Sequence, residues 1–269
     1  MMHKHFKKTI TTFFLFVAFS LTNSAFAAYD MIVMPVMPAK ELKKAYAPLT
    51  QYLSKTTGQK INLVTSPNYL AYWQRMKKGE YDLVLDAAHL VDFRVKKLDY
   101  DVLAKVKDKV SFSIVSAGHN PILDPDELIG KQVACMVPPS RGGLQIDQYY
   151  PNLMRQPIKV QVDSFEEAVY KLNSGQVDAA VIPTPLLNKY TNLNVIESTE
   201  LWPHMGLTAS PSVPDSVKAS IKKALTDATF EEKRTQMLAS AGMSGFELAD
   251  NTVYDGYIAA LKNSWGFKD

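Results

Sequence analysis

The chain reads Asn68-Tyr-Leu-Ala-Tyr-Trp-Gln-Arg-Met-Lys-Lys-Gly79-Glu-Tyr-Asp82-Leu-Val-Leu85, and 96 residues later it reads Ser164-Phe-Glu-Glu-Ala-Val-Tyr-Lys-Leu-Asn-Ser-Gly175-Gln-Val-Asp178-Ala-Ala-Val181. In both copies a capping side chain begins a helix, a glycine ends it, and an aspartate leads into an apolar strand. Each copy follows a strand and helix of its own. The repeat therefore predicts two similar α/β lobes, and two lobes form a cleft in which a small ligand can bind.

Outside the repeat, apolar runs alternate with stretches of helical periodicity. Residues 31–36 and 61–64 are predicted strands, with a helix beginning after Pro38 between them. The same alternation continues as far as the strand over residues 194–196, and three helices are predicted after residue 204. This order predicts an α/β fold of mostly parallel sheets flanked by helices.

The first 27 residues predict an export signal. Three lysines precede a short apolar stretch, and Ala25-Phe-Ala27 has the small-x-small form of a signal peptidase site. The stretch is short for a membrane span, so we expect cleavage and a soluble exported chain that begins at Ala28; an uncleaved anchor is the alternative. Without these residues the formal net charge falls from +3 to about 0, so nucleic acid is not an expected partner.

The sequence gives little support to a metal centre or to nucleophilic catalysis. The exported chain has His89, His119 and His204, which are far apart and lack metal-ligand spacing. The single cysteine, Cys135, excludes an internal disulfide; it is either a buried structural residue or a soft contact at the cleft. No hydrolase motif around a serine or cysteine is present. We therefore expect a protein that is not an enzyme and needs no metal or other cofactor.

Candidate ligand-binding residues follow the carboxyl ends of the predicted strands, where α/β sheets bind ligands at helix N-termini. The strongest candidate is the loop Ser140-Arg141-Gly142-Gly143. Its serine can donate a hydroxyl, its arginine a bidentate fork, and its glycines allow close backbone approach. An ordinary turn capped by serine is the alternative.

Other strand ends carry weaker candidates. Asn68 and Tyr69 follow the second strand, and Asp86 and His89 follow the third. Asp86 would repel a fully ionised oxyanion, but it could accept a hydrogen bond from a protonated one or contact an amine, and His89 could donate in the same place. Thr184 stands at the matching position of the second repeat. Capping of the helix that follows is the alternative reading of these residues.

Together these segments resemble the periplasmic solute-binding proteins of ABC importers of the phosphate, phosphite and phosphonate type. The likeness covers most of the chain after residue 27. Its markers are Ala47-Pro-Leu49, Tyr52-Leu53, Thr57-Gly58, Asn68-Tyr69, Gly79-Glu-Tyr-Asp82-Leu-Val, Asp126-Glu-Leu-Ile-Gly-Lys131, Pro139-Ser140 and Gly175-Gln-Val-Asp178-Ala-Ala-Val.

The resemblance implies a two-lobed periplasmic-binding-protein fold of type II, with two crossover strands as the hinge. Lobe 1 would be residues 29–115 plus 206–269 and lobe 2 residues 116–205, with crossovers near Val115 and Gly206. Family members hold an oxyanion with Ser, Thr and Tyr side chains and helix N-termini, and these roles fall on Tyr69 and on Ser140 with the residues just after it. The implied partner is an inner-membrane ABC permease, with a sensor kinase as the alternative, and a periplasmic monomer is expected.

Two departures from the family pattern bear on the ligand. The stretch after Pro139, usually rich in Ser and Thr, reads Ser140-Arg-Gly-Gly, which loses hydroxyls and gains a cation. The segment after the third strand, usually small and uncharged, carries Asp86 and His89. Both departures favour an oxyanion other than a simple phosphonate, or a zwitterion with an amine near Asp86.

Overall fold

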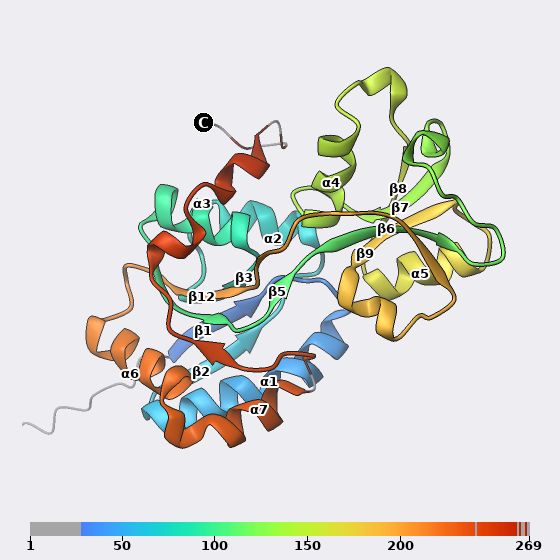
Figure 1. Ribbon diagram of the computed structural model, residues 1–269. Helices are drawn as coiled ribbons and strands as arrows, with labels where there is room; N and C mark the ends of the chain where they lie inside the picture. Colours follow the sequence, from blue (N-terminus) through green and yellow to red (C-terminus); the bar gives the residue numbers. More distant parts are fainter. Residues whose placement is uncertain (1–27, 240, 263, 265–266, 268–269) are drawn as a thin grey trace, which may run out of the picture.

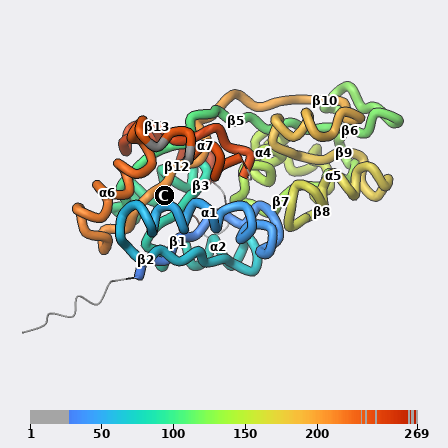
Figure 2. Tube along the Cα trace, turned by 90° about the horizontal axis from the view of Figure 1, so that it is seen from below, coloured from blue at the N-terminus to red at the C-terminus, as the bar shows by residue number. Residues whose placement is uncertain are grey.

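A computed structural model describes residues 28–239, 241–262, 264 and 267 of the protein. Its helices and strands form two lobes, each built around its own sheet, which lie next to each other (Figures 1 and 2). The predicted signal segment, residues 1–27, lies outside the described residues. Within the described part of the chain, no helix combines the length and the apolar character needed to cross a membrane.

The first lobe contains a six-stranded sheet in the order β13-β4-β12-β3-β1-β2. The strands β1, β2 and β3 are parallel, whereas β12 runs antiparallel to β3 and β4. The strand bounds are β1 Ala28–Val33, β2 Lys60–Val64, β3 Leu83–Asp86, β4 Asp101–Val106, β12 Gly206–Ala209 and β13 Phe246–Glu247.

The helices of the first lobe cover both faces of this sheet. They are α1 Ala39–Thr57, α2 Tyr69–Met76, α3 Ala88–Leu98, α6 Asp215–Thr226 and α7 Glu231–Ala239, with short 3-10 turns η4 Ala228–Phe230, η5 Asn251–Tyr254 and η6 Tyr257–Leu261. Alternate residues of β1 point to opposite faces. Met31 and Val33 pack with Leu49 of α1, whereas Ile32 packs in the cluster that contains Trp73 of α2.

The second lobe contains a five-stranded sheet in the order β10-β6-β9-β7-β8. The strand β7 is parallel to β8 and β9, and β6 is antiparallel to β9 and β10. The bounds are β6 Phe112–Ala117, η1 Pro125–Leu128, β7 Gln132–Met136, α4 Arg141–Tyr149, η2 Leu153–Arg155, β8 Ile158–Val162, α5 Phe165–Asn173, β9 Ala179–Pro183, η3 Thr184–Asn188 and β10 Leu193–Ser198.

Two connections join the lobes. The short strands β5, Lys109–Val110, and β11, Trp202–Pro203, pair antiparallel as the chain leaves the first lobe and returns to it. Val115 pairs with Val195 and Ala180 inside the second sheet. The outward passage therefore lies at β5, a few residues before Val115.

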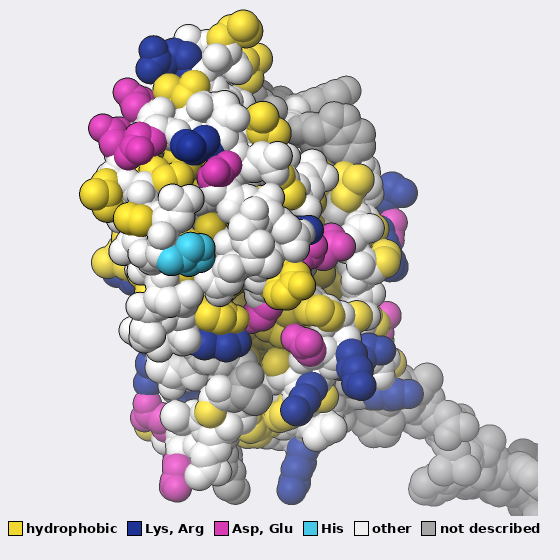
Figure 3. Space-filling model, turned by 90° about the vertical axis from the view of Figure 1, so that its right-hand side faces the viewer, with side chains coloured by type: hydrophobic (Ala, Val, Ile, Leu, Met, Phe, Trp, Pro, Cys, Tyr) yellow, Lys and Arg dark blue, Asp and Glu magenta, His cyan; other side chains and the backbone are white. Residues whose placement is uncertain are grey.

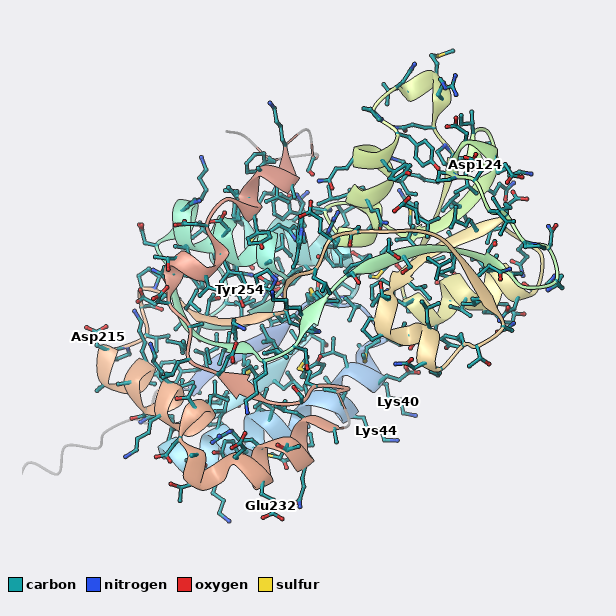
Figure 4. The ribbon with its side chains drawn as sticks, viewed as in Figure 1. Lys40, Lys44, Asp124, Asp215, Glu232 and Tyr254 are labelled. Carbon is teal, nitrogen blue, oxygen red and sulfur yellow. The ribbon has the colours of Figure 1, made fainter. Side chains whose placement is uncertain are left out.

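The return passage is closely packed where it enters the first lobe. Tyr254 donates its hydroxyl to the carbonyl of His204 at 3.0 Å, and its side chain lies beside the connections in Figure 4. A Cβ on Gly206 would lie 2.8 Å from the Tyr254 hydroxyl oxygen. Only glycine fits at the first residue of β12 without moving that ring.

The repeat that predicted the lobes has the same local structure in both. Asn68 accepts a hydrogen bond from the Ala71 amide, and Ser164 accepts one from the Glu167 amide, so each begins its helix as expected. Gly79 has φ 68° and Gly175 φ 71°, in the left-handed region that favours glycine after a helix.

The repeat aspartates also share one role. Asp82 accepts a hydrogen bond at 2.8 Å from the amide of Asp30 in β1, and Asp178 accepts one at 2.8 Å from the amide of Gln132, the first residue of β7. Each carboxylate therefore links the segment after the repeat helix to the neighbouring strand. This shared role explains why aspartate occurs in both copies of the repeat.

Two predicted helices are shorter than the sequence pattern indicated. The helix expected at 144–154 is α4 followed by η2, because Pro151 disfavours a helical conformation at Tyr150. The helix expected at 253–264 is two 3-10 turns, η5 and η6, separated by Gly256 at φ 91°. The strand expected at 110–116 is divided into β5 and β6.

Candidate functional site

A cavity of about 250 Å³ is bounded by residues of both lobes and of the connections between them. Tyr69 and His89 come from the first lobe, Ser140 and Arg141 from the second, and Trp202 from β11. Tyr69, His89, Ser140 and Arg141, from three separate strand ends, therefore meet at one place as the strand-end argument predicted.

Arg141 is the one Lys or Arg among the residues that the structure shows lining the cavity. Its Cζ lies 4.0 Å from the centroid of the Trp202 ring, and its Nη1 donates to Gln148 Oε1 at 2.9 Å. Burial lowers the pKa of Arg141 to about 10, so the guanidinium stays charged at neutral pH. Within the described residues it forms no ion pair with a carboxylate. The described residues therefore place no carboxylate in contact with this guanidinium, and Glu200 acts on its charge only from a greater distance.

The start of α4 adds a partial positive charge at the same place. Ser140 caps the helix: its Oγ accepts from the Gly143 amide at 3.0 Å and donates to the Met136 carbonyl at 2.9 Å. The amides of Arg141 and Gly142, in the first turn, have no partner among the described residues. Free first-turn amides and the helix dipole favour an anion. The hydroxyl of Ser140 is already used in capping, so it is not a free donor here.

The glycines of the predicted loop have a packing role. A Cβ on Gly143 would lie 2.4 Å from the Met136 carbonyl oxygen and 2.7 Å from the Pro138 nitrogen. A Cβ on Gly142 would make an ordinary contact of 3.5 Å with Val181. Gly143 therefore lets α4 begin close against the end of β7, and neither glycine is among the cavity-lining residues.

His89 reaches across the cavity from the first lobe. Its side chain is fully buried, and its Nε2 lies 2.8 Å from the carbonyl oxygen of Pro139. A carbonyl only accepts, so Nε2 carries the proton and Nδ1 is left as an acceptor, with no partner among the described residues. Burial, together with the charge of Arg141, lowers the pKa of His89 to about 4, although the hydrogen bond with Pro139 acts in the opposite direction. His89 is therefore neutral at pH 7, and its Nδ1 can accept a hydrogen bond from a ligand.

Tyr69 supplies a hydroxyl to the cavity. Its ring is buried and meets the Tyr72 ring edge-on, with the centroids 5.8 Å apart. Burial, with the nearby Asp86 carboxylate, raises the pKa of Tyr69 well above its usual value, so the phenol stays protonated and can donate. Asn68 is exposed and uses its side chain to cap α2, outside the cavity lining.

Asp86 does not reach the cavity, in contrast to the expectation that it contacts the ligand. Its carboxylate is fully buried, pairs with Arg94 Nε at 2.7 Å, and accepts the hydroxyl of Tyr72. These donors come from α3 and α2, behind the cavity wall. Thr184 is also absent from the lining: its Oγ1 bonds Ser111 Oγ and Ser113 Oγ, each at 2.8 Å.

The cavity walls are largely apolar, and the sequence analysis named none of their aliphatic or phenylalanine side chains as ligand contacts. Met34, Met37, Phe112, Phe165 and Met243 line it together with Trp202. These residues come from distant parts of the chain, and only the packing of the two lobes brings them together. No local sequence motif marks Trp202 as the surface on which Arg141 rests.

The described residues contain no group of three or more His, Cys, Asp and Glu side chains arranged to hold a metal ion. Cys135 lies buried in β7, outside the cavity lining, and burial raises the pKa of its thiol to about 12. The thiol is therefore protonated and packed, as the structural reading of this residue expects.

Comparison with known proteins gives one family match and several structural likenesses. A family model described as ABC transporter, phosphonate, periplasmic substrate-binding protein matches residues 31–254. A search of curated proteins returns no match.

Three solved structures illustrate the likeness of fold. PhnD1 from Prochlorococcus marinus, in complex with methylphosphonate, has a TM-score of 0.75 at 14% identity, covering 87% of this chain and 97% of its own. A binding protein component of an ABC phosphonate transporter from Pseudomonas aeruginosa has a TM-score of 0.72 at 16% identity, covering 87% and 84%. A protein from Xanthomonas citri bound to ATP has a TM-score of 0.70 at 11% identity, covering 87% and 97%.

Proposed function

Because the chain belongs to the periplasmic substrate-binding proteins of phosphonate ABC transporters, we propose that it captures a phosphonate-like oxyanion or zwitterion between its lobes and delivers it to an inner-membrane ABC permease. The observation that carries the proposal is Arg141. It lines the cavity at the start of α4, rests on Trp202, and has no carboxylate partner among the described residues. A partly buried cation without a carboxylate contact is best satisfied by a bound anion.

The other polar groups of the cavity fit an oxyanion that keeps one proton, or a ligand with an amine. The guanidinium and the amide of Arg141 and the Tyr69 hydroxyl can donate hydrogen bonds. His89 Nδ1 accepts one, which a hydroxyl on phosphorus or an ammonium group can supply. We propose Tyr69, His89, Ser140 and Arg141 as the ligand-binding group. Asn68, Gly142, Gly143, Thr184 and Asp86 would support it through capping, packing and the buried pair behind the wall.

We propose that capture and release use a hinge at the connections β5 and β11. The moving bodies would be lobe 1, residues 29–115 plus 206–269, and lobe 2, residues 116–205. The hinge in the connection from lobe 1 to lobe 2 would lie closer to β5 than to Val115. Since His89 and Pro139 belong to different lobes, opening would break their hydrogen bond. We further propose that the protein works as a periplasmic monomer without catalytic turnover, after removal of a signal within residues 1–27.

Isothermal titration calorimetry of purified protein with phosphate, methylphosphonate, 2-aminoethylphosphonate and sulfate tests the proposal. At least one phosphorus oxyanion should bind, and Arg141→Ala should weaken it by more than tenfold, as expected for loss of a charge-assisted contact. Arg155→Ala is the matched control, because Arg155 is an exposed arginine of the same lobe outside the cavity. Absence of binding by every phosphorus compound, or equal effects of the two substitutions, would contradict the proposal.

A further inference from the structure

The cavity is larger and less polar than an inorganic oxyanion requires. Its volume of about 250 Å³ exceeds by more than tenfold the roughly 10–15 Å³ that one water needs. Apolar side chains from both lobes and from the C-terminal part of the chain form most of its wall, among them Met34, Met37, Leu186 and Met243. A ligand of a few polar atoms would leave much of this wall without contacts.

Two polar side chains of the cavity, Arg141 and His89, gather around the Trp202 ring. Arg141 stacks on Trp202, and His89 meets the same ring edge-on with the centroids 6.2 Å apart. The hydroxyl of Ser140 and the Nδ1 of His204 already have partners in Met136 and the Met205 amide. The acid Glu166 also lines the cavity, with Lys189 Nζ 3.9 Å away. One cation and few free donors suit one small anionic head, because each further buried charge would need its own partners.

Basic residues of the nearby helix α1 add no positive charge to the cavity lining. Lys40 and Lys44 are exposed and point outward in Figure 4, and neither lines the cavity. The methionines at the wall are unbranched and polarizable, so they adapt to apolar groups of different shape. The wall is therefore suited to a hydrocarbon substituent of variable form.

We propose that the ligand is an amphiphilic organophosphonate, whose anionic head binds at Arg141 and whose apolar substituent of several carbon atoms packs against Met34, Met37, Leu186 and Met243. This inference rests on the proposed function and narrows its substrate class. Inorganic phosphate and methylphosphonate, which lack such a substituent, would bind weakly.

Calorimetry at pH 7 with phosphate, methylphosphonate, butylphosphonate and phenylphosphonate measures the contribution of the substituent. Burial of each added methylene should tighten binding about fourfold, so butylphosphonate should bind at least tenfold tighter than methylphosphonate. Phenylphosphonate should do the same. Butanol, which has the chain without the anion, should give no measurable binding.

Substitutions in the wall separate the two ends of the ligand. Met37→Asn and Leu186→Asn, on opposite lobes, should each weaken butylphosphonate about tenfold and change methylphosphonate by less than twofold. Met154→Asn is the matched control, because Met154 is 90% exposed on η2 and does not line the cavity. On the face of the molecule shown in Figure 3, apolar side chains lie among charged ones.

The outcomes distinguish this inference from the function on which it rests. If methylphosphonate or phosphate binds as tightly as butylphosphonate, the substituent proposal is wrong and the oxyanion-binding function stands. If none of the four anions binds, the substituent proposal is wrong, and if 2-aminoethylphosphonate does not bind either, the proposed function is wrong as well. If butylphosphonate binds tightly but Met37→Asn and Leu186→Asn have no more effect than Met154→Asn, the assigned wall is wrong.

Discussion

His89 Nε2 and the Pro139 carbonyl oxygen lie 2.8 Å apart, although His89 belongs to α3 of the first lobe and Pro139 to the loop before α4 of the second. The ring is also held edge-on against Trp202 of the connection β11. A buried, neutral imidazole therefore contacts both lobes and the passage between them. Its protonation state is thereby linked to how the lobes fit together.

The first prediction concerns the pH dependence of stability. The folded pKa of His89 is about 4, against 6.5 without burial, so between these values the unfolded chain binds a proton that the folded chain does not. The free energy of unfolding therefore rises with pH across this window. The contribution of His89 is complete above about pH 6.5 and is lost toward pH 4, by on the order of 3 kcal/mol. His204, whose pKa burial also lowers, acts in the same direction.

Urea denaturation of the wild type and His89→Gln between pH 4.5 and 7.5 measures this effect. Glutamine keeps a donor near Pro139 but does not titrate, so the variant should have a flatter profile. His119→Gln, at an exposed turn, should follow the wild type. Parallel profiles for His89→Gln and the wild type would show that His89 does not carry the linkage.

The second prediction concerns the buried pair behind the cavity. Arg94→Met leaves the fully buried Asp86 carboxylate without its cation, so the free energy of unfolding should fall by about 3–5 kcal/mol. The double variant Asp86→Leu/Arg94→Met should be more stable than Arg94→Met alone, because it removes the unpaired charge. Urea denaturation in a double-mutant cycle checks both; additive losses would rule out the coupling.

The third prediction contrasts two adjacent glycines. Gly143→Ala places a Cβ against backbone atoms of Met136 and Pro138, so it should destabilise the protein by about 1–3 kcal/mol and weaken phosphonate binding. Gly142→Ala has room beside Val181 and should be neutral or stabilise by up to about 1 kcal/mol, since alanine favours helix. Thermal denaturation ranks the two, and equal effects would contradict the close approach of α4 to β7.

The fourth prediction concerns the support of Arg141. Trp202→Leu removes the ring on which the guanidinium lies, and loss of this contact should weaken binding of the best phosphonate about tenfold. Trp202→Phe keeps an aromatic face and should recover part of the loss. Calorimetry with the same phosphonate measures both variants. Equal affinities for Trp202→Leu and Trp202→Phe would show that the aromatic face does not matter.

The sequence predicted the local features of the fold well because they depend on short-range chemistry. The caps at Asn68 and Ser164 and the left-handed glycines Gly79 and Gly175 are decided by neighbouring residues. The two-lobed α/β fold and the family were predicted from the order of strands, helices and short motifs along the chain. The predicted helices at 144–154 and 253–264 were too long. Apolar periodicity alone does not indicate where a proline or a glycine interrupts a helix.

The candidate site was predicted in part. Strand-end position pointed to Tyr69, His89, Ser140 and Arg141, which line the cavity and whose binding of a ligand stays a prediction, but it did not indicate the burial of Asp86. Asp86 and Arg94 are eight residues apart, a spacing that a sequence does not distinguish from a helix cap followed by a surface cation. The apolar walls depend on contacts between distant segments and on the packing of the lobes, which no local pattern encodes.

The order of the strands in the first sheet differs from the order in which they are synthesised. β12 lies between β3 and β4, yet it begins at Gly206, after the whole second sheet has been made by Ser198. A nascent chain can thus complete its second lobe while the first lobe, which begins with β1, still lacks a central strand. Until β12 and β13 have been synthesised, β4 has no partner strand on either side and β3 has none on one side, so the first sheet cannot be completed before the second lobe.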